Sequence, residues 1–184
     1  MNATKKALIL TWTGFQDQEV VYPYYRLKGA GYEVSIISDT MDAKGRTYGI
    51  CGVNMPCAMT YDTFYAQMGV LLVSNTLLVI PGGVKALEKL RLEKRVISFI
   101  QQWNQLPHRL IASTCHGAQL LISANIIRGK TICGYYSIED DIRNAGATYS
   151  RAPCVVSGNI VSSPHYDFMG EWMETVIQEH AYNV

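Results

Sequence analysis

Short β-type runs alternate with stretches of helical spacing along the first part of this chain. Lys6–Thr11 is a compact apolar run, and Asp17–Gly29 carries apolar side chains at the spacing of one helix face. Glu33–Ser38 follows as a second β-type run. A strand, a helix and a strand within about 30 residues form a βαβ unit, whose two strands are parallel. The pattern therefore predicts an α/β fold built on a parallel sheet.

The same alternation continues toward the C-terminus, interrupted by a segment rich in turn-forming residues. Residues 39–61 contain many Asp, Gly, Asn and Pro residues and are expected to form a loop or a hairpin excursion. Further strands are predicted at Thr76–Ile80, Arg109–Ser113 and Thr131–Cys133, with a hairpin at Val155–Val161. Helices are predicted at Tyr61–Met68, Lys85–Gln105, Gln119–Ile127, Ile138–Ala145 and Phe168–His180. No repeat, low-complexity tract or linker divides the chain, so a single domain is expected over residues 1–184.

The composition is that of a soluble globular protein and argues against several classes of partner. Of the 184 residues, 48% are hydrophobic and 17% are charged, and the formal net charge is +1 without any block of like charges. We therefore expect no nucleic-acid partner and no membrane partner. No apolar run approaches the roughly 20 residues of a membrane span. The apolar run within residues 1–10 is too short for a signal peptide and predicts a buried strand instead, which favours a cytoplasmic protein.

The cysteine content argues against disulfide bonds and against a metal site. The five cysteines are an odd number, and no two of them form a Cys-x-x-Cys pair. A disulfide framework and a zinc site are therefore not expected. Reduced thiols in the cytoplasm are the simpler interpretation, and neither a metal nor another cofactor is predicted.

One cysteine, Cys115, stands in a sequence context typical of a nucleophile. A β-type run precedes it, a helical stretch follows it, and the small residues Ser113 and Gly117 stand two positions to either side. This is the spacing of a nucleophile elbow, in which a larger side chain would collide with the tight turn. Free N–H groups at the start of the following helix would favour the thiolate. The alternative is a buried structural cysteine, which is our interpretation of the cysteines that lack this context: Cys51, Cys57, Cys133 and Cys154.

Three further features are expected at the same edge of the sheet. His116 could fold back beside the sulfur or cap the helix, and the turn leaves both interpretations open. The strand before Pro81-Gly82-Gly83 ends in two glycines, which let the backbone approach a ligand; with the N–H of His116, one of them could form an oxyanion hole. Glu19 is a candidate acid–base group, although the pattern alone favours a surface Glu at a helix N-terminus.

Several segments, in the same order along the chain, resemble the PfpI intracellular protease family, part of the superfamily that includes DJ-1. They are Phe15–Glu19 with Tyr22-Pro23, the turn Pro81-Gly82-Gly83, Thr114–Gly117 with the following AQLLISANIIRGK, Glu139–Ala147, and Val155–Ser162. The resemblance covers roughly residues 6–180. The Cys-His-Gly elbow, the glycine turn and the upstream Glu are specific for the superfamily, whereas the ISAxxxRGK and DDxxNAG patterns point to the PfpI branch.

The resemblance implies a flavodoxin-like three-layer sandwich with a mostly parallel sheet, and it implies roles for individual residues. Cys115 would be the nucleophile, His116 its partner, and Glu19 the acid that hydrogen-bonds the thiolate. An oxyanion site would lie near Gly83 and His116. In PfpI-type proteins a further Glu completes the site across a subunit interface, and Glu88 matches it, although this chain has one additional residue before that position. A homodimer or a homohexamer is therefore expected.

Two segments depart from the family pattern, and both are expected to line the site. Ser162–Asp167 lacks an Arg that the family usually carries, and Tyr135-Tyr136-Ser137 replaces an aromatic-Pro-Gly sequence. These changes suggest a substrate different from that of other members. The candidate oxyanion or substrate-binding residues are Gly82, Gly83, Gly117, Tyr136 and His165.

The sequence leaves three functions open. The first, which we favour, is an enzyme without a cofactor in which Cys115 attacks an aldehyde, ketoaldehyde or acyl carbon and Glu19 or His116 moves a proton. The glyoxalase and deglycase activities of the superfamily are of this kind. The second is a cysteine peptidase acting on small peptides. The third is a redox sensor or stress chaperone whose thiol is oxidised to the sulfinic acid. The altered segments also allow a dedicated biosynthetic enzyme, whose substrate the sequence does not identify.

Overall fold

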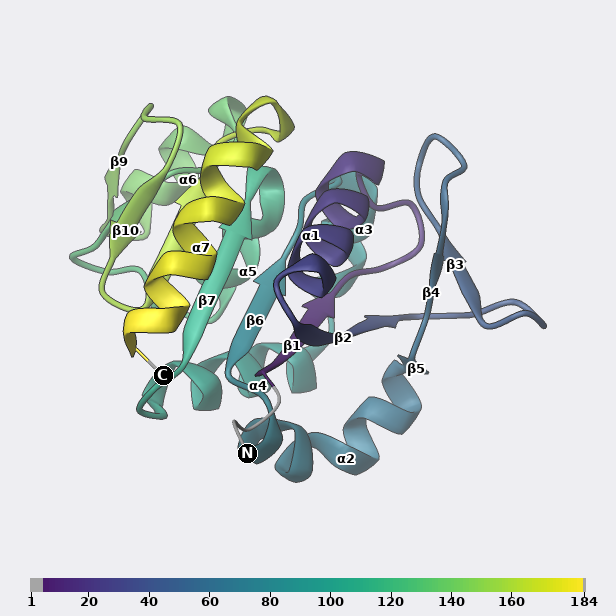
Figure 1. The fold of residues 1–184 in the computed structure, drawn as a ribbon. Coiled ribbons are helices and arrows are strands. Elements are labelled where there is room, and N and C mark those ends of the chain that lie inside the picture. The colour runs from purple at the N-terminus through teal and green to yellow at the C-terminus, as the bar shows by residue number, and fades with distance from the viewer. Residues whose placement is uncertain (1–4, 184) are drawn as a thin grey trace.

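The computed structural model describes residues 5–183 and shows a layered α/β domain (Figure 1). The strands are β1 (Lys5–Leu10), β2 (Tyr32–Ser38), β3 (Arg46–Tyr48), β4 (Asn54–Pro56), β5 (Met59–Thr60), β6 (Leu77–Ile80), β7 (Leu110–Thr114), β8 (Thr131–Ile132), β9 (Thr148–Tyr149), β10 (Val155–Ser157) and β11 (Ile160–Ser163). The helices are α1 (Asp17–Gly29), α2 (Tyr61–Ser74), α3 (Val84–Leu90), α4 (Lys94–Gln105), α5 (Ala118–Ser123), α6 (Glu139–Asn144) and α7 (Met169–Asn183). Short 3-10 helices lie at η1 (Cys115–Gly117), η2 (Tyr136–Ile138) and η3 (Tyr166–Phe168).

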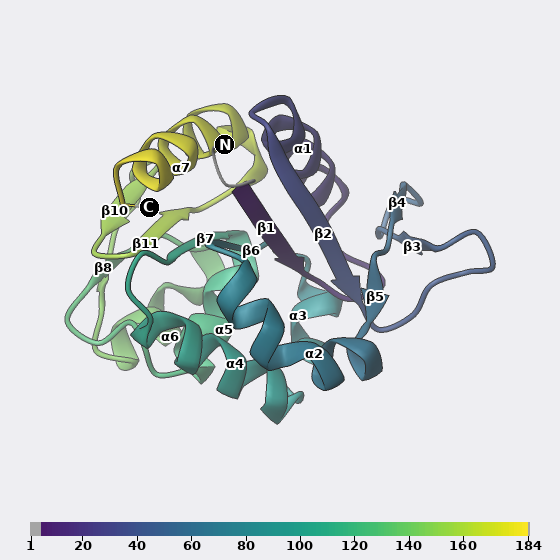
Figure 2. The same ribbon diagram turned by 60° about the horizontal axis from the view of Figure 1, so that its bottom comes forward.

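A seven-stranded sheet, in the order β10-β11-β7-β6-β1-β2-β5, forms the middle layer. Neighbouring strands in it are parallel, except that β10 and β11 form an antiparallel hairpin. Helices α1 and α7 cover one face, and α2 to α6 lie on the other (Figure 2). The predicted three-layer fold with a mostly parallel sheet is therefore confirmed.

The central strands are buried on both faces, which explains their continuous apolar runs. All four residues of β6 are fully buried. Trp103 of α4 and Trp172 of α7 pack on opposite faces of the sheet, and their indole N–H groups donate to the carbonyls of Leu110 and Val161, each at 3.3 Å. The core thus holds the strands whose carboxyl ends carry the candidate site.

The prediction of one long helix over Lys85–Gln105 is wrong. The chain forms α3 and α4 with a break between them, because Glu93 has φ −76° and ψ 89° and does not continue a helix. Tyr65 donates a hydrogen bond to the Glu93 carboxylate at 2.6 Å, and Arg91 donates one to Ser123 at 3.0 Å, so both ends of the break are held by tertiary contacts. Amphipathic spacing alone does not reveal such a break.

Other predicted elements differ mainly at their ends. Helix α2 continues to Ser74, beyond the predicted end at Met68. Helix α5 ends at Ser123 rather than at Ile127, and Asn125 shortly after it has a left-handed φ of 55°. The remaining predicted helices and strands are present with small shifts of their ends.

The predicted excursion contains the hairpin β3–β4, which projects beside the sheet (Figure 1). Asp17, at the start of α1, accepts hydrogen bonds from the backbone N–H groups of Cys51 and Val53, each at 2.9 Å. An added Cβ on Gly49 would lie 2.6 Å from the same carboxylate. The excursion is therefore tied to the helix that carries Glu19. Within residues 5–183, none of the helices has the length and apolar character needed to cross a bilayer.

Candidate active site

Cys115 occupies a strained turn between β7 and the short helix η1. Its φ is 55°, a left-handed value that costs a residue with a side chain about 1–2 kcal/mol. The residue before it, Thr114, is extended, and Ala118 after η1 begins helix α5. The predicted strand–turn–helix geometry of a nucleophile elbow is present.

Gly117 is required by the close approach of the elbow to a neighbouring strand. An added Cβ on Gly117 would lie 2.3 Å from the carbonyl oxygen of Ile80 and 3.0 Å from Oγ of Ser113. The small residues to either side of Cys115 therefore have the steric cause that the spacing predicted. Gly117 is not among the residues that line the pocket described below, so the contacts give it a structural role and its predicted part in substrate binding stays a prediction.

We expect Gly117→Ala to lower the melting temperature of the protein and the rate at which Cys115 reacts, because the added methyl group must push the elbow away from β6. Overpacking of this kind costs about 1–3 kcal/mol. Gly69→Ala is the matched control, since nothing lies within 4 Å of its added Cβ and alanine favours the helix α2 in which it lies. Thermal unfolding of both variants tests this, and an unchanged melting temperature for Gly117→Ala would contradict the steric explanation.

Glu19 is fully buried, so the surface position favoured by the helix pattern alone is wrong. Its Oε2 accepts a hydrogen bond from the N–H of Gly82 at 2.6 Å. An added Cβ on Gly82 would lie 2.6 Å from Glu19 Oε2 and 3.0 Å from Cys115 Sγ. The carboxyl group and the sulfur therefore converge on the same glycine of the turn, as the resemblance implied.

Burial raises the pKa of Glu19 to about 7, against the opposing effects of the Gly82 N–H and of Cys115. Burial also raises the pKa of the Cys115 thiol, and the negative charge of Glu19 raises it further. The backbone N–H groups of His116 and Gly83 act in the opposite direction. The expected stabilisation of the thiolate by the helix start is thus outweighed, because the thiol is only 6% exposed and faces a carboxylate.

Burial raises the pKa of both groups, and an ionised Glu19 opposes the loss of the proton from the thiol. When Glu19 is ionised, its charge holds the proton on the sulfur. When the proton moves to Glu19, the repulsion disappears and the thiolate faces a neutral carboxylic acid. Glu19 is therefore placed to take the proton from Cys115 and to return it later.

His116 folds back beside the sulfur, with 3.3 Å between its Nδ1 and Cys115 Sγ. Of the two interpretations left open by the sequence, the structure shows the one in which the imidazole contacts the thiol. Burial lowers the pKa of His116, which favours the neutral ring at neutral pH. The ring of Tyr135 stacks on the imidazole with 4.7 Å between centroids.

A pocket of about 290 Å³ opens over the sulfur. It is lined by Gln16, Glu19, Gly83, Val84, Cys115, His116, Tyr135, His165 and Tyr166. The backbone N–H groups of His116 and Gly83 both lower the pKa of the Cys115 thiol, so they are close enough to act on the sulfur, and donors in this part of the pocket suit an oxyanion formed next to it. Gly83 must be glycine, because its φ is 106° and an added Cβ would lie 2.6 Å from the backbone nitrogen of Gln16.

The chain matches one described family over nearly its whole length. The model of the DJ-1/PfpI family matches residues 5–179. This chain belongs to the DJ-1/PfpI family.

Two archaeal relatives that are named deglycases are similar to almost the whole chain. It is 36% identical over 173 residues to a deglycase of Pyrococcus horikoshii, covering 94% of this chain and 98% of that protein. It is 34% identical over 173 residues to Deglycase PfpI of Pyrococcus furiosus, with the same coverage. The solved structure of Schizosaccharomyces pombe DJ-1 superposes with a TM-score of 0.84 at 16% identity, covering 95% of this chain and 90% of that one, which shows the shared fold.

Besides Gly117, three residues predicted from the sequence are not among those that line the pocket. Tyr136 is half exposed and its neighbour Tyr135 lines the pocket, so contact of Tyr136 with a substrate stays a prediction. The N–H of Gly82 donates a hydrogen bond to the Glu19 carboxylate, so this N–H already has an acceptor within the protein. Glu88 lies on the exposed side of α3, outside the residues that line the pocket of its own chain.

Four lining residues were not predicted. Tyr135 and Tyr166 lie next to Tyr136 and His165, the positions chosen in the two segments that depart from the DJ-1/PfpI pattern, and of the chosen pair His165 lines the pocket. Gln16 lies in the segment Phe15–Glu19 that carries the family resemblance, and Val84 directly follows the glycine turn, so their positions in the sequence were the signals available.

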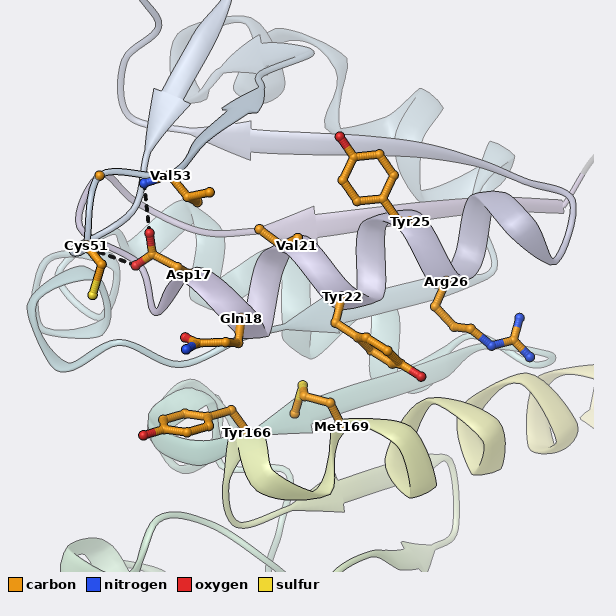
Figure 3. A pocket seen from close by; sticks show the side chains of 11 residues that line it. Asp17, Gln18, Val21, Tyr22, Tyr25, Arg26, Cys51, Val53, Tyr166 and Met169 are labelled. Atoms are coloured by element: carbon orange, nitrogen blue, oxygen red, sulfur yellow. Dashed lines mark hydrogen bonds between the residues drawn. The ribbon is translucent and has the colours of Figure 1, made fainter.

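A larger groove of about 950 Å³ lies beside the pocket, between α1 and the start of α7 (Figure 3). Its walls include Val21, Tyr22, Tyr25, Val53 and Met169. Tyr166 lines both the groove and the thiol pocket. Among residues 5–183, no group of three or more His, Cys, Asp or Glu side chains is placed to hold a metal ion.

Proposed function

We propose that this protein is a cysteine-dependent enzyme without a cofactor that acts on a small carbonyl or acyl compound, in the manner of a glyoxalase or deglycase. The observation that carries the proposal is the convergence of Cys115 Sγ, the Glu19 carboxyl and two backbone N–H groups in one small pocket. The names of the archaeal relatives as deglycases support it.

The groups in the pocket suit nucleophilic addition to a carbonyl carbon. The proton of Cys115 moves to Glu19, and the sulfur forms a bond to the carbonyl carbon while the carbonyl π electrons move to oxygen. The N–H groups of Gly83 and His116 stabilise the resulting oxyanion, which then takes the proton from Glu19. The product of this step is a hemithioacetal, and no electron acceptor is needed.

An α-oxoaldehyde such as methylglyoxal can then be converted without an external oxidant. A proton leaves C1, and a proton is added at C2, which turns the hemithioacetal into a thioester of a 2-hydroxy acid. Water cleaves the thioester to release the acid and the thiol. In a deglycase reaction, the sulfur replaces the amine of a hemiaminal: the carbon–nitrogen bond breaks, the carbon–sulfur bond forms, and the proton that Glu19 took from the thiol goes to the departing amine.

The dimensions of the pocket favour small substrates over proteins. Its volume of about 290 Å³ lies at the lower limit for pockets that bind small molecules. Oxidation of a thiol needs neither donors for an oxyanion nor a group that returns a proton, so the presence of both beside Cys115 favours carbonyl chemistry over the redox-sensor alternative. All five cysteines are free thiols within residues 5–183, which fits the reducing cytoplasm that we propose as its location.

The proposed function is tested by turnover of methylglyoxal and of a methylglyoxal adduct of an amino acid, followed by NMR. The wild-type protein should release lactate from at least one of them without any added cofactor. Release of a 2-hydroxy acid or a free amine would support the proposal. Peroxide-dependent oxidation of Cys115 with no turnover of any carbonyl substrate would favour a sensor instead.

We also propose that Glu88 acts in the site of a neighbouring subunit of a homodimer or homohexamer. Its exposed position on α3, the helix that follows the glycine turn, is compatible with such a contact. Glu88→Gln should lower turnover at least tenfold, and mixing Glu88→Gln with Cys115→Ala should restore part of the activity through hybrid sites.

The control for this experiment is Asp62→Asn, which neutralises an exposed carboxylate on α2, remote from the glycine turn in the sequence. It should keep full activity. Sedimentation of the wild-type protein should give an oligomer, and a fully active monomer would contradict the shared site.

A further inference from the structure

His165 and Asp167 form a contact beside the thiol pocket that the assignments above do not use. The two residues lie in the connection between β11 and α7, at the short helix η3. Nδ1 of His165 is 3.0 Å from Oδ2 of Asp167. The imidazole of His165 lines the pocket of Cys115, whereas the Asp167 side chain is 67% exposed and does not line it.

Nδ1 of His165 has two contacts that call for different positions of the proton. The backbone N–H of Asp167 donates to Nδ1 at 3.4 Å, which needs Nδ1 without a proton, whereas the Asp167 carboxylate at 3.0 Å accepts a proton from Nδ1. The carboxylate contact is the shorter of the two and favours the proton on Nδ1. A proton on Nδ1 that is donated to Asp167 leaves the lone pair of Nε2 free to accept a proton. A histidine oriented by a carboxylate in this way is a common arrangement for a general base.

His165 is distinct in position from the imidazole that contacts the sulfur. The ring of Tyr135 has His116 as one neighbour, at 4.7 Å between centroids, and His165 as another, at 5.8 Å. His116 is engaged with Cys115 Sγ through its Nδ1. The pocket therefore holds two imidazoles, one in contact with the sulfur and one whose ring neighbour is Tyr135.

The proposed reaction has one step for which no other group has been assigned. Conversion of an α-oxoaldehyde requires a base that removes the proton from C1 of the hemithioacetal and returns one to C2. Glu19 contacts the glycine turn and the sulfur, where it handles the proton of the thiol and of the oxyanion. A base that reaches the neighbouring carbon should stand apart from the sulfur, as His165 does.

We propose that His165, oriented by Asp167, is the base that moves the proton between the two carbons of an α-oxoaldehyde substrate; this rests on the proposed function. The C1–H bond breaks and Nε2 holds the proton, while the electron pair forms the C1–C2 double bond and the C2 carbonyl π electrons move to oxygen to give an enediolate. The hydroxyl proton on the C1 oxygen moves to the C2 oxygen, the C1 carbonyl forms, and C2 takes the proton from Nε2. This gives the thioester of the 2-hydroxy acid and returns His165 to its neutral form. Asp167 is a positioning residue in this scheme.

The test compares His165→Gln, Asp167→Asn and the wild-type protein on methylglyoxal and on methylglyoxal deuterated at C1. His165→Gln should lower kcat about 100-fold or more, within the range of general acid–base catalysis. It should also increase the isotope effect of the deuterated substrate. Asp167→Asn should give a smaller loss and a shifted pH profile, because the imidazole is retained.

Two further measurements separate a chemical role from a structural one. The rate at which iodoacetamide alkylates Cys115 should be unchanged in His165→Gln, and imidazole added to His165→Ala should restore part of the activity. Asp140→Asn, an exposed change on α6, is the control that should keep full activity.

The outcomes distinguish this proposal from the one on which it rests. Wild-type turnover with an equally active His165→Gln would overturn the role of His165 and leave the cysteine enzyme intact. A loss of turnover with an unchanged isotope effect and no rescue by imidazole would also overturn it. No turnover of any α-oxoaldehyde by the wild-type protein would overturn both proposals.

Discussion

Cys115→Ala and Cys115→Ser are expected to abolish turnover of carbonyl substrates while leaving the fold intact. Cys115 holds the left-handed φ of the turn, and no other sulfur lines the pocket among the described residues. Loss of a nucleophile that forms a covalent intermediate lowers kcat by about a thousandfold or more. Serine is not a substitute, because its hydroxyl is far less acidic than a thiol and neither Glu19 nor His116 is positioned for a nucleophile with a shorter bond to Cβ.

The control for the cysteine variants is Cys51→Ser, which changes an exposed thiol outside the thiol pocket. It should retain wild-type activity. Mass spectrometry after incubation with substrate should find an adduct on Cys115 in the wild-type protein and in Cys51→Ser, and none in Cys115→Ala. Turnover by Cys115→Ala would place the chemistry elsewhere and would reject the site.

Glu19→Gln should have the second largest effect, with a loss of about 100-fold or more in kcat. The amide cannot take the proton of Cys115. In the wild-type protein, activity should rise as the pH increases through about 7, because Glu19 must be ionised to accept that proton. This rise should be absent in Glu19→Gln. The pKa of the thiol should fall in the variant, since the negative charge beside it is removed.

The same substitution should change how stability depends on pH. The pKa of Glu19 rises from 4.5 to about 7 in the folded protein, so the folded state holds a proton that the unfolded state has lost between these values. Wild-type stability should therefore fall as the pH rises from about 4.5 to about 7, by about 3 kcal/mol at 1.36 kcal/mol per pH unit. Glu19→Gln has no such group and should gain stability relative to wild type at pH 8 compared with pH 4.5.

Chemical denaturation at the two pH values measures this difference directly. Asp62→Asn is again the control, because an exposed carboxylate should not change the pH dependence in this way. An equal pH dependence in wild type and Glu19→Gln would mean that Glu19 is ionised in the folded protein without cost, and its role in proton transfer would have to be abandoned.

Much of the fold could be predicted because its central strands are buried on both faces and therefore leave a clear apolar signal. Helix α1 was predicted with the bounds that the structure shows, since turn-forming residues flank it. The break between α3 and α4 could not be predicted, because it depends on contacts of Arg91 and Glu93 with Ser123 and Tyr65, residues distant in sequence. The apolar spacing of a helix shows which of its faces is buried, and it does not show which distant residues contact its ends.

The parts of the candidate site that depend on close packing could be predicted from the sequence. The protonation behaviour of its acidic groups, which depends on electrostatics, was less predictable. The elbow at Cys115 and the small residue at position 117 follow from close packing, which the spacing of the sequence records. The burial of Glu19 does not follow from its helix pattern and was indicated only by the family resemblance. The direction of the thiol pKa shift depends on the balance of burial, a neighbouring carboxyl and two N–H groups, and that balance exists only in the folded chain.

Gly82 has a consequence for how this site can vary during evolution. The volume that a side chain would occupy there is already filled by Glu19 Oε2 and by the Cβ and sulfur of Cys115. The spacing between acid and nucleophile is therefore set by main-chain atoms and does not depend on which rotamer a neighbour adopts. Residues at the mouth, such as Tyr135 and Tyr166, can be exchanged to admit new compounds while the reactive pair beneath them keeps its geometry.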